Sequence, residues 1–195
     1  NPEPRTPNPE PHPVPPRVYL TGFMASGKST VGPLLADRLG YRFVDLDWLV
    51  EAQTGRTILD LFAEGEAVFR AAEAEALRET TRGPKVVVST GGGTLAEAAN
   101  LHTARHAGVV VWLRASPATT VTRLGDAAGR PMLAGDDGRP LRGEALDARI
   151  RVLLGAREPF YAQADLVADA DGRPEAVARD IAERLRRWSK DARAR

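Results

Sequence analysis

The chain has 195 residues, 43% of them hydrophobic, which is enough for one domain with a sizeable core. Its 27 Lys and Arg residues almost balance 26 Asp and Glu residues, and the net charge of +1 argues against nucleic acid or an anionic membrane as the main partner. The absence of cysteine excludes disulfides and thiolate sites, and with no long apolar run and no signal-peptide pattern we expect a cytoplasmic protein without a membrane partner.

The start of the sequence is unusually rich in proline. Residues 1–16 contain eight of the 15 prolines. Because proline lacks a backbone N–H and favours an extended polyproline helix, we expect this segment to be a disordered tail; the alternative is a ligand for a groove that takes such segments. We therefore expect the folded domain over residues 17–188, followed by a charged tail over 189–195.

Strand and helix patterns alternate along the rest of the chain. In order they predict a strand at 18–21, a helix at 28–39, a strand at 41–46, helices at 47–54, 57–63 and 66–80, strands at 85–89 and 109–113, a helix at 116–124, a loop at 125–143, a helix at 145–157, a strand at 166–168 and a helix at 174–188. The strand centres are continuously apolar, which is typical of a parallel sheet covered on both faces. We predict an α/β fold whose ligands bind at the carboxyl ends of the strands.

Residues 22–29, Gly-Phe-Met-Ala-Ser-Gly-Lys-Ser, match the phosphate-loop (P-loop) pattern between a strand and a helix. In such loops backbone N–H groups converge on phosphate oxygens at the start of a helix. Lys28 would reach the β- and γ-phosphates, and Ser29 would bind Mg²⁺. For Thr30, contact with the α-phosphate and an ordinary place in the first helical turn are both open. We predict a nucleotide site formed by Gly22, Ala25, Ser26, Gly27, Lys28, Ser29 and Thr30.

Three weaker signals follow the P-loop. Asp45 and Asp47 end the second predicted strand, where we expect them to share a face; one could organise Mg²⁺ and the other accept a hydroxyl proton, although Asp47 could simply cap a helix. Arg70 could bind a carboxylate or lie in solvent. The run 91–93, Gly-Gly-Gly, could offer backbone N–H groups to a ligand or form only a tight turn.

The class of P-loop protein can be narrowed by what is missing. GTPases need an Asn/Thr-Lys-x-Asp sequence after a strand, and the strand at 109–113 leads instead into Arg-Ala-Ser-Pro. Large ATPase motors need a longer chain. Small-molecule kinases remain.

Together the motifs resemble the shikimate kinase family, from about residue 18 to 185. The resemblance is carried by residues 22–30 (Gly-Phe-Met-Ala-Ser-Gly-Lys-Ser-Thr), 43–47 (Phe-Val-Asp-Leu-Asp), 66–70 (Glu-x-x-Phe-Arg), 89–93 (Ser-Thr-Gly-Gly-Gly), 129–133 (Gly-Arg-Pro-Met-Leu) and 157–161 (Arg-Glu-Pro-Phe-Tyr). It implies a fold of the nucleoside-monophosphate-kinase type, with a five-stranded parallel sheet and a mobile lid at about 125–143. It also implies Mg²⁺-dependent transfer of the ATP γ-phosphate to the 3-hydroxyl of shikimate, in aromatic amino-acid biosynthesis. We expect a monomer.

The resemblance assigns roles on the acceptor side. Asp47 would hold the shikimate hydroxyls, including the attacking one, and Asp45 would belong to the magnesium shell. Arg70 and Arg157 would clamp the carboxylate. The ring hydroxyls would meet the backbone of Gly92 and Gly93.

On the nucleotide side, Arg130 would close from the lid onto the transferring phosphate, and Arg123 would stack on adenine. Lys28, Asp47 and Arg130 are thus the expected catalytic residues. Two positions depart from the family: Ala25 stands where glycine is frequent, and Pro33 falls within the first helix and could distort its first turn. Two alternatives stay open, namely another small-metabolite kinase such as a gluconate kinase, and a regulator that binds ATP without turnover.

Overall fold

The computed structural model describes residues 14–125, 131–135, 137 and 139–188. Five strands form one parallel sheet in the order β2-β3-β1-β4-β5, with bounds β1 Arg17–Thr21, β2 Arg42–Asp45, β3 Val86–Ser89, β4 Val109–Arg114 and β5 Leu166–Asp169. The central strand β1 pairs with β3 in the register Tyr19 to Val88 and with β4 in the register Tyr19 to Val110. The predicted five-stranded parallel sheet is confirmed.

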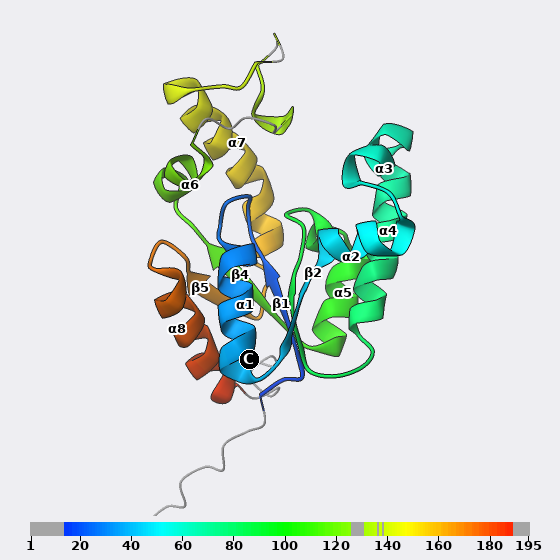
Figure 1. The fold of residues 1–195 in the computed structure, drawn as a ribbon. Helices are drawn as coiled ribbons and strands as arrows, with labels where there is room; N and C mark the ends of the chain where they lie inside the picture. The colour runs from blue at the N-terminus through cyan, green and yellow to red at the C-terminus, as the bar shows by residue number, and fades with distance from the viewer. Residues whose placement is uncertain (1–13, 126–130, 136, 138, 189–195) are drawn as a thin grey trace, which may run out of the picture.

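Helices cover both faces of this sheet (Figure 1). Their bounds are α1 Lys28–Leu39, α2 Leu46–Thr54, α3 Ile58–Glu64, α4 Glu66–Thr80, α5 Ala98–Ala107, α6 Pro117–Leu124, α7 Gly143–Tyr161 and α8 Pro174–Arg186, with short 3₁₀ turns η1 Thr94–Ala96 and η2 Pro131–Leu133. None of the helices in the described part of the chain has the length and apolar character needed to cross a membrane.

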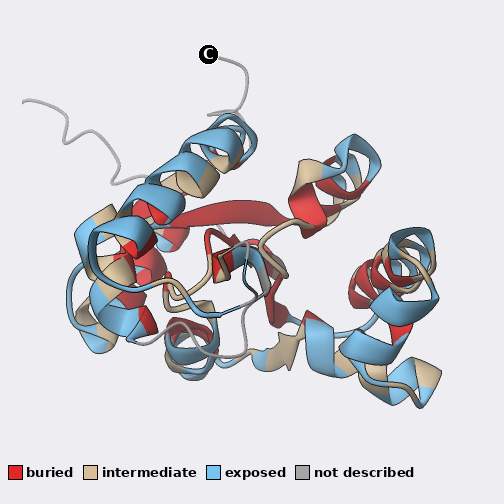
Figure 2. Cartoon of the chain, turned by 90° about the horizontal axis from the view of Figure 1, so that it is seen from above, coloured by how far each residue is buried: buried red, intermediate tan, exposed pale blue. Residues whose placement is uncertain are grey.

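The core is divided by the sheet into two layers, as side-chain alternation along a strand requires. Val18 and Leu20 of β1 pack with the inner faces of α1 and α8, whereas Tyr19 between them packs with residues of α4 and α5. Seen from above, the three central strands β3, β1 and β4 and the inward faces of the helices are largely buried, and the outward faces are exposed (Figure 2). The centre of the sheet is therefore buried on both faces, and the edge strands β2 and β5 are partly exposed.

Two groups of elements rise above the carboxyl ends of the strands (Figure 1). On one side stand α3 and the start of α4, and on the other stand α6, η2 and the start of α7. A third apolar cluster joins the second group to the P-loop, because Phe23 packs there with Trp112 of β4 and Tyr161 of α7. In open α/β sheets, ligands generally bind beside the carboxyl ends of the strands, and the two groups of elements flank that position.

The structure corrects the prediction for Asp45 and Asp47. Strand β2 ends at Asp45, and Asp47 lies in the first turn of α2, so the two residues do not share a strand face. Asp45 is the residue that caps the helix: its Oδ1 accepts a hydrogen bond of 3.1 Å from the backbone N–H of Asp47. The N–H groups of a first helical turn need such an acceptor, and the strand accordingly ends at Asp45, one residue before the predicted end at 46.

Two further helix predictions need correction. Helix α1 runs without interruption through Pro33, so its first turn keeps helical geometry. Helix α7 was expected to end at residue 157 but continues through Pro159 to Tyr161. Pro159 lies in the last turn, where only one backbone hydrogen bond is lost before the helix ends. The extension adds a complete turn after Arg157 and places Tyr161 on the same helix.

Three predicted segments fall partly or wholly outside the described residues. Within the expected lid at 125–143, the structure describes η2 and a single bridge that pairs Ala134 with Pro140, while Arg130 lies outside the described residues. The predicted charged tail over 189–195 and most of the proline-rich segment also lie outside them. At the end of that segment, the hydroxyl of Tyr41 bonds the carbonyl oxygens of Val14 and Pro15, both at 3.2 Å.

Candidate active site

The P-loop connects β1 to α1 and has the backbone conformation that its glycines predict. Gly22 and Gly27 have φ angles of 146° and 98°, in the region open to residues without a β-carbon. Ala25 also has a positive φ, 58°, in the small left-handed region that L-residues can enter at some cost. A glycine at this position would adopt the same conformation without that cost.

Lys28, the first residue of α1, turns back over the loop. Its Nζ donates to the carbonyl oxygens of Gly22 at 2.8 Å and Phe23 at 3.0 Å. These bonds hold the ammonium group above the loop, at the N-terminus of α1, where the positive end of the helix dipole also favours an anion.

A groove of about 480 Å³ lies beside the start of α1 and is called here the P-loop groove. It is lined by Ala25, Gly27, Lys28, Ser29, Thr30, Val31, Arg123, Ala170, Gly172 and Pro174. The guanidinium of Arg123 joins its two walls: Nη1 donates to the carbonyl oxygens of Ala25 and Ser26 at 3.4 and 3.3 Å, and Nη2 to that of Ala170 at 2.7 Å. The groove therefore brings together six of the residues predicted to bind the nucleotide, and adds the β5–α8 connection, which the sequence motifs did not indicate.

Ser29 and Asp45 form the pair expected at a metal site. The Ser29 hydroxyl donates to Oδ2 of Asp45 over 3.2 Å, at the mouth of the P-loop. Mg²⁺ takes oxygen ligands and commonly keeps several waters, so one hydroxyl, one carboxylate and nucleotide phosphates form a suitable set. The residues present fit a magnesium ion bound together with a nucleotide.

A second cavity, of about 230 Å³, opens between the two groups of elements above the sheet and is called the glycine cavity. Its lining residues are Phe23, Met24, Asp47, Ile58, Phe62, Phe69, Arg70, Glu73, Gly91, Gly92, Gly93, Met132, Arg157 and Tyr161. The predicted residues Asp47, Arg70, Gly92, Gly93 and Arg157 all meet here, although they come from four separate segments. Because Phe23 and Met24 belong to the P-loop, the glycine cavity and the P-loop groove lie on two sides of one loop.

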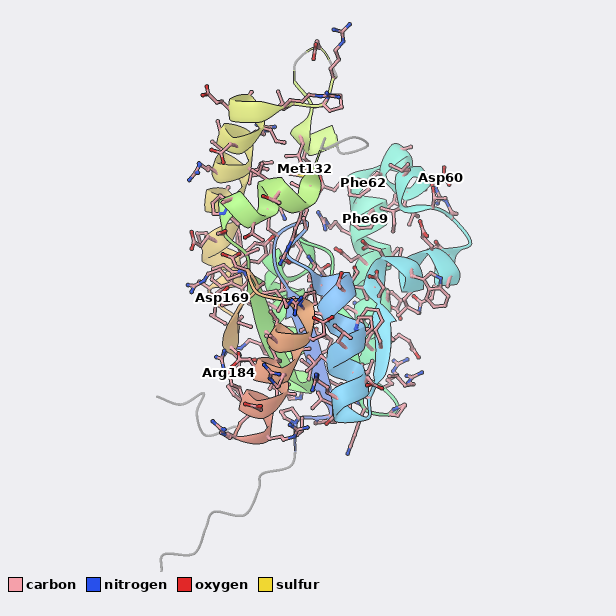
Figure 3. All side chains as sticks on the ribbon, turned by 60° about the vertical axis from the view of Figure 1, so that its left-hand side comes forward. Asp60, Phe62, Phe69, Met132, Asp169 and Arg184 are labelled. Atoms are coloured by element: carbon pink, nitrogen blue, oxygen red, sulfur yellow. The ribbon has the colours of Figure 1, made fainter. Side chains whose placement is uncertain are left out.

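One end of the glycine cavity is lined by apolar side chains from both sides. The rings of Phe62 and Phe69 stack with their centroids 4.3 Å apart, and Met132 of η2 lies across the cavity from them (Figure 3). Phe62 and Met132 keep 42% of their surfaces exposed, so a ligand in the cavity could cover apolar surface that otherwise meets water. The cavity thus suits a small ligand with an apolar face.

The opposite end of the cavity is cationic. Arg157 donates from Nη1 to the Gly92 carbonyl over 3.0 Å, and Arg70 donates from Nη1 to Oε2 of Glu73 over 2.8 Å. A β-carbon placed on Gly93 would lie 2.9 Å from Arg157 Nη1 and 3.2 Å from Arg70 Nη2. Two guanidinium groups thus converge on a backbone with no side chain, and this geometry suits a bound carboxylate.

Glu73 is a site residue that the sequence analysis missed. It is 1% exposed, and besides its ion pair with Arg70 it accepts a 2.5 Å hydrogen bond from the Thr94 hydroxyl. Thr94 follows the glycine run directly, and its backbone N–H bonds the Gly91 carbonyl. Glu73 therefore ties Arg70 to the glycine run; its position three residues after Arg70 on a helix was the available signal.

The carboxylate of Asp47 has a raised pKa. Loss of hydration among the packed groups of the cavity is the main cause, although the residue as a whole remains open to solvent. The charges of Asp45 and Glu73 raise the pKa further, and Lys28 opposes them. A carboxylate in such surroundings is a better proton acceptor than a free aspartate.

Tyr161 is the second site residue without a prediction of its own. Its hydroxyl donates to the Gly92 carbonyl over 2.8 Å, and burial raises the pKa of this hydroxyl to about 12. Tyr161 lies one helical turn after Arg157 because α7 continues to residue 161. The predicted helix ended at residue 157 and therefore did not place the two side chains on one face.

Comparisons of the sequence and of the fold with known proteins agree on one family. A family model described as shikimate kinase matches residues 24–186. A shikimate kinase of Chlorobium chlorochromatii (strain CaD3) is 45% identical over 80% of this chain and 83% of its own. The structure of a shikimate kinase from Bacteroides thetaiotaomicron superposes with a TM-score of 0.76 at 36% identity, over 87% of this chain and 97% of its own. That of a shikimate kinase from Acinetobacter baumannii in complex with shikimate has a TM-score of 0.72 at 34% identity, over 89% and 92%.

Proposed function

The chain belongs to the shikimate kinase family, and from that premise we propose that it transfers the γ-phosphate of ATP to the 3-hydroxyl of shikimate, forming shikimate 3-phosphate and ADP. The observation that carries this proposal is the convergence of Arg70 and Arg157 on Gly93, in a cavity that shares the P-loop with the nucleotide groove. Shikimate offers what that cavity would recognise: one carboxylate, a partly apolar ring and several hydroxyls.

The P-loop groove binds ATP in this proposal. Backbone N–H groups at the start of α1 meet the phosphates, and Lys28 leaves the carbonyl oxygens of Gly22 and Phe23 to neutralise the β- and γ-phosphates. Arg123, anchored between the two walls of the groove, covers the adenine. Ser29 and Asp45 would hold Mg²⁺ with its waters, and the ion would neutralise charge on the phosphate oxygens.

The glycine cavity binds the acceptor. Arg70 and Arg157 hold the carboxylate, while Phe62, Phe69 and Met132 cover the ring and exclude water. Binding the carboxylate at the far end of the cavity fixes which hydroxyl faces the P-loop. This arrangement converts a reaction between two molecules into one between held neighbours, which is a large part of catalysis in phosphoryl transfer.

Asp47 orients the attacking hydroxyl and accepts its proton. It lines the glycine cavity close enough to Lys28 for their charges to interact, so it lies where the two sites meet. In a loose transition state the hydroxyl needs little deprotonation, and its orientation matters first. Arg130, which lies outside the described residues, is proposed to add positive charge at the transferring phosphate.

A coupled assay that follows ADP release tests the function and separates it from the two alternatives. With ATP and Mg²⁺, shikimate is expected to support turnover and gluconate to give only the background rate. Equal turnover with gluconate would favour a different metabolite kinase, and ATP binding without turnover on either acceptor would favour a regulator. Lys28→Ala is the matched control, because it removes the phosphate-binding ammonium and leaves the glycine cavity intact.

A further inference from the structure

The carbonyl oxygen of Gly92 accepts hydrogen bonds from two side chains of the same helix. Arg157 Nη1 lies 3.0 Å from it and Tyr161 Oη lies 2.8 Å from it. The two residues are four apart in α7, so both project from one face of the helix. A carbonyl bonded by two donors from one rigid helix has its direction fixed.

The fixed carbonyl also fixes an amide. The Gly92 C=O and the Gly93 N–H belong to one planar trans peptide, in which they point in opposite directions. Among the described residues, the N–H groups of Gly92 and Gly93 donate no hydrogen bond to the protein. Gly92 and Gly93 both line the glycine cavity. Because glycine has unusual backbone freedom, the peptide between them needs a further contact to hold its orientation.

Tyr161 is well placed to hold it. The side chain is 3% exposed, and its ring packs against Trp112 of β4 with the centroids 5.8 Å apart. Burial raises the pKa of the hydroxyl to about 12, so it stays a donor throughout the range in which enzymes work. Tyr161 also packs in the same cluster as Phe23, which connects this anchor to the P-loop.

We propose that Tyr161 is a positioning residue for the acceptor: its hydroxyl holds the Gly92–Gly93 peptide so that the Gly93 amide meets a ring hydroxyl of the substrate. Arg157 divides its donors between the Gly92 carbonyl and, in the proposed function, the substrate carboxylate. The Tyr161 hydroxyl has no such second role, and it is committed to the Gly92 carbonyl. The inference rests on the proposed function, since it takes shikimate as the occupant of the glycine cavity.

The test compares two variants that each lose one phenolic hydroxyl. Tyr161→Phe keeps the buried ring and removes the bond to Gly92. Tyr41→Phe is the matched control, because the Tyr41 hydroxyl also bonds backbone carbonyls, those of Val14 and Pro15, but Tyr41 lines neither site. We expect Tyr161→Phe to raise the KM for shikimate about 5- to 30-fold with the KM for ATP unchanged, as the loss of a hydrogen bond at the acceptor site alone predicts. Tyr41→Phe should leave both constants unchanged.

Substrate analogues distinguish positioning from a general loss of structure. Shikimate analogues that lack one ring hydroxyl each are compared on the wild type and on Tyr161→Phe. The penalty of the mutation should disappear for the analogue without the hydroxyl that meets Gly93. Normal turnover by the wild type, combined with an unchanged KM in Tyr161→Phe or an equal penalty for every analogue, would overturn this inference alone. A wild type inactive on shikimate would overturn the proposed function and this inference with it.

Discussion

The guanidinium groups of Arg70 and Arg157 meet at one point of the glycine cavity, above the α-carbon of Gly93. A β-carbon at that position would lie within 3.2 Å of both groups. The two arginines come from α4 and α7, on opposite sides of the cavity, and each is tied to the glycine run by a different route. Arg70 is held through Glu73 and Thr94, and Arg157 bonds Gly92 directly. Hydrogen bonds within the protein thus hold both arginines at the position proposed for the substrate carboxylate.

This convergence predicts that Arg70→Ala impairs acceptor binding selectively. Truncating one partner of a buried charged hydrogen bond costs about 2–5 kcal/mol, so the KM for shikimate should rise by more than tenfold while that for ATP stays near its wild-type value. Steady-state kinetics with each substrate varied in turn measures both.

Two further variants make the Arg70 result interpretable. Arg70→Lys keeps a cation for Glu73 but loses the two-pronged geometry, and should remain impaired. Arg78→Ala removes an exposed arginine of the same helix, paired with Glu75, and should be neutral. An equal rise of both KM values in Arg70→Ala would contradict the carboxylate role.

Glu73 should matter for the same constant although it need not touch the carboxylate. Glu73→Gln keeps the shape but weakens the bond to Arg70, and bonds to charged groups contribute about 1.5–3 kcal/mol. We expect a rise in the KM for shikimate and a lower melting temperature. Glu75→Gln on the exposed face is the control and should change neither. A Glu73→Gln variant with wild-type kinetics would show that Arg70 holds its position unaided.

Asp47→Asn tests the chemistry. The change keeps one acceptor oxygen but removes the charge, so kcat should fall by roughly 10²–10⁴, the range typical of general acid–base contributions. ATP affinity measured by calorimetry should change little, because Lys28 and Ser29 remain. Since the pKa of Asp47 is raised, the acid limb of the kcat profile should lie above the pH expected for a free aspartate, and Asp47→Asn should abolish it. A near-normal kcat would leave Asp47 without a catalytic role.

The same substitution has an opposite effect on stability. With its pKa raised by folding, Asp47 binds a proton more tightly in the folded protein than in the unfolded chain. The favourable contribution is fully present below the pKa of the unfolded residue and is lost as the pH rises through the folded pKa. Asp47→Asn should therefore raise the melting temperature at pH 7, and the difference should shrink as the pH falls toward about 3. A lower melting temperature at pH 7 would contradict this account of the electrostatics.

The sequence was most informative where local patterns decide the structure. Continuous apolar runs predicted the five strands, and the P-loop pattern predicted residues that line the P-loop groove, because both patterns follow from short-range chemistry. Asp47 was misplaced on a strand because the capping of α2 by Asp45 competes with strand pairing at that point. That competition cannot be judged from alternation alone.

The cavity residues without a prediction were missed for a different reason. Glu73 and Tyr161 are ordinary helix residues by composition, and their roles arise only when α4 and α7 are brought to the glycine run. The same is true of Phe62 and Met132, which face each other from elements 70 residues apart in the sequence. Spacing from a predicted arginine, three residues for Glu73 and four for Tyr161, was the one local hint.

The central claim is that the γ-phosphate of ATP reaches the 3-hydroxyl of shikimate, and nuclear magnetic resonance of the product tests it most directly. After incubation of the full chain with ATP, Mg²⁺ and shikimate, the phosphorus spectrum should show a single new phosphate monoester, coupled to the ring proton at carbon 3 and equal in amount to the ADP formed. Inorganic phosphate as the sole product, or a monoester coupled to another ring proton, would contradict it.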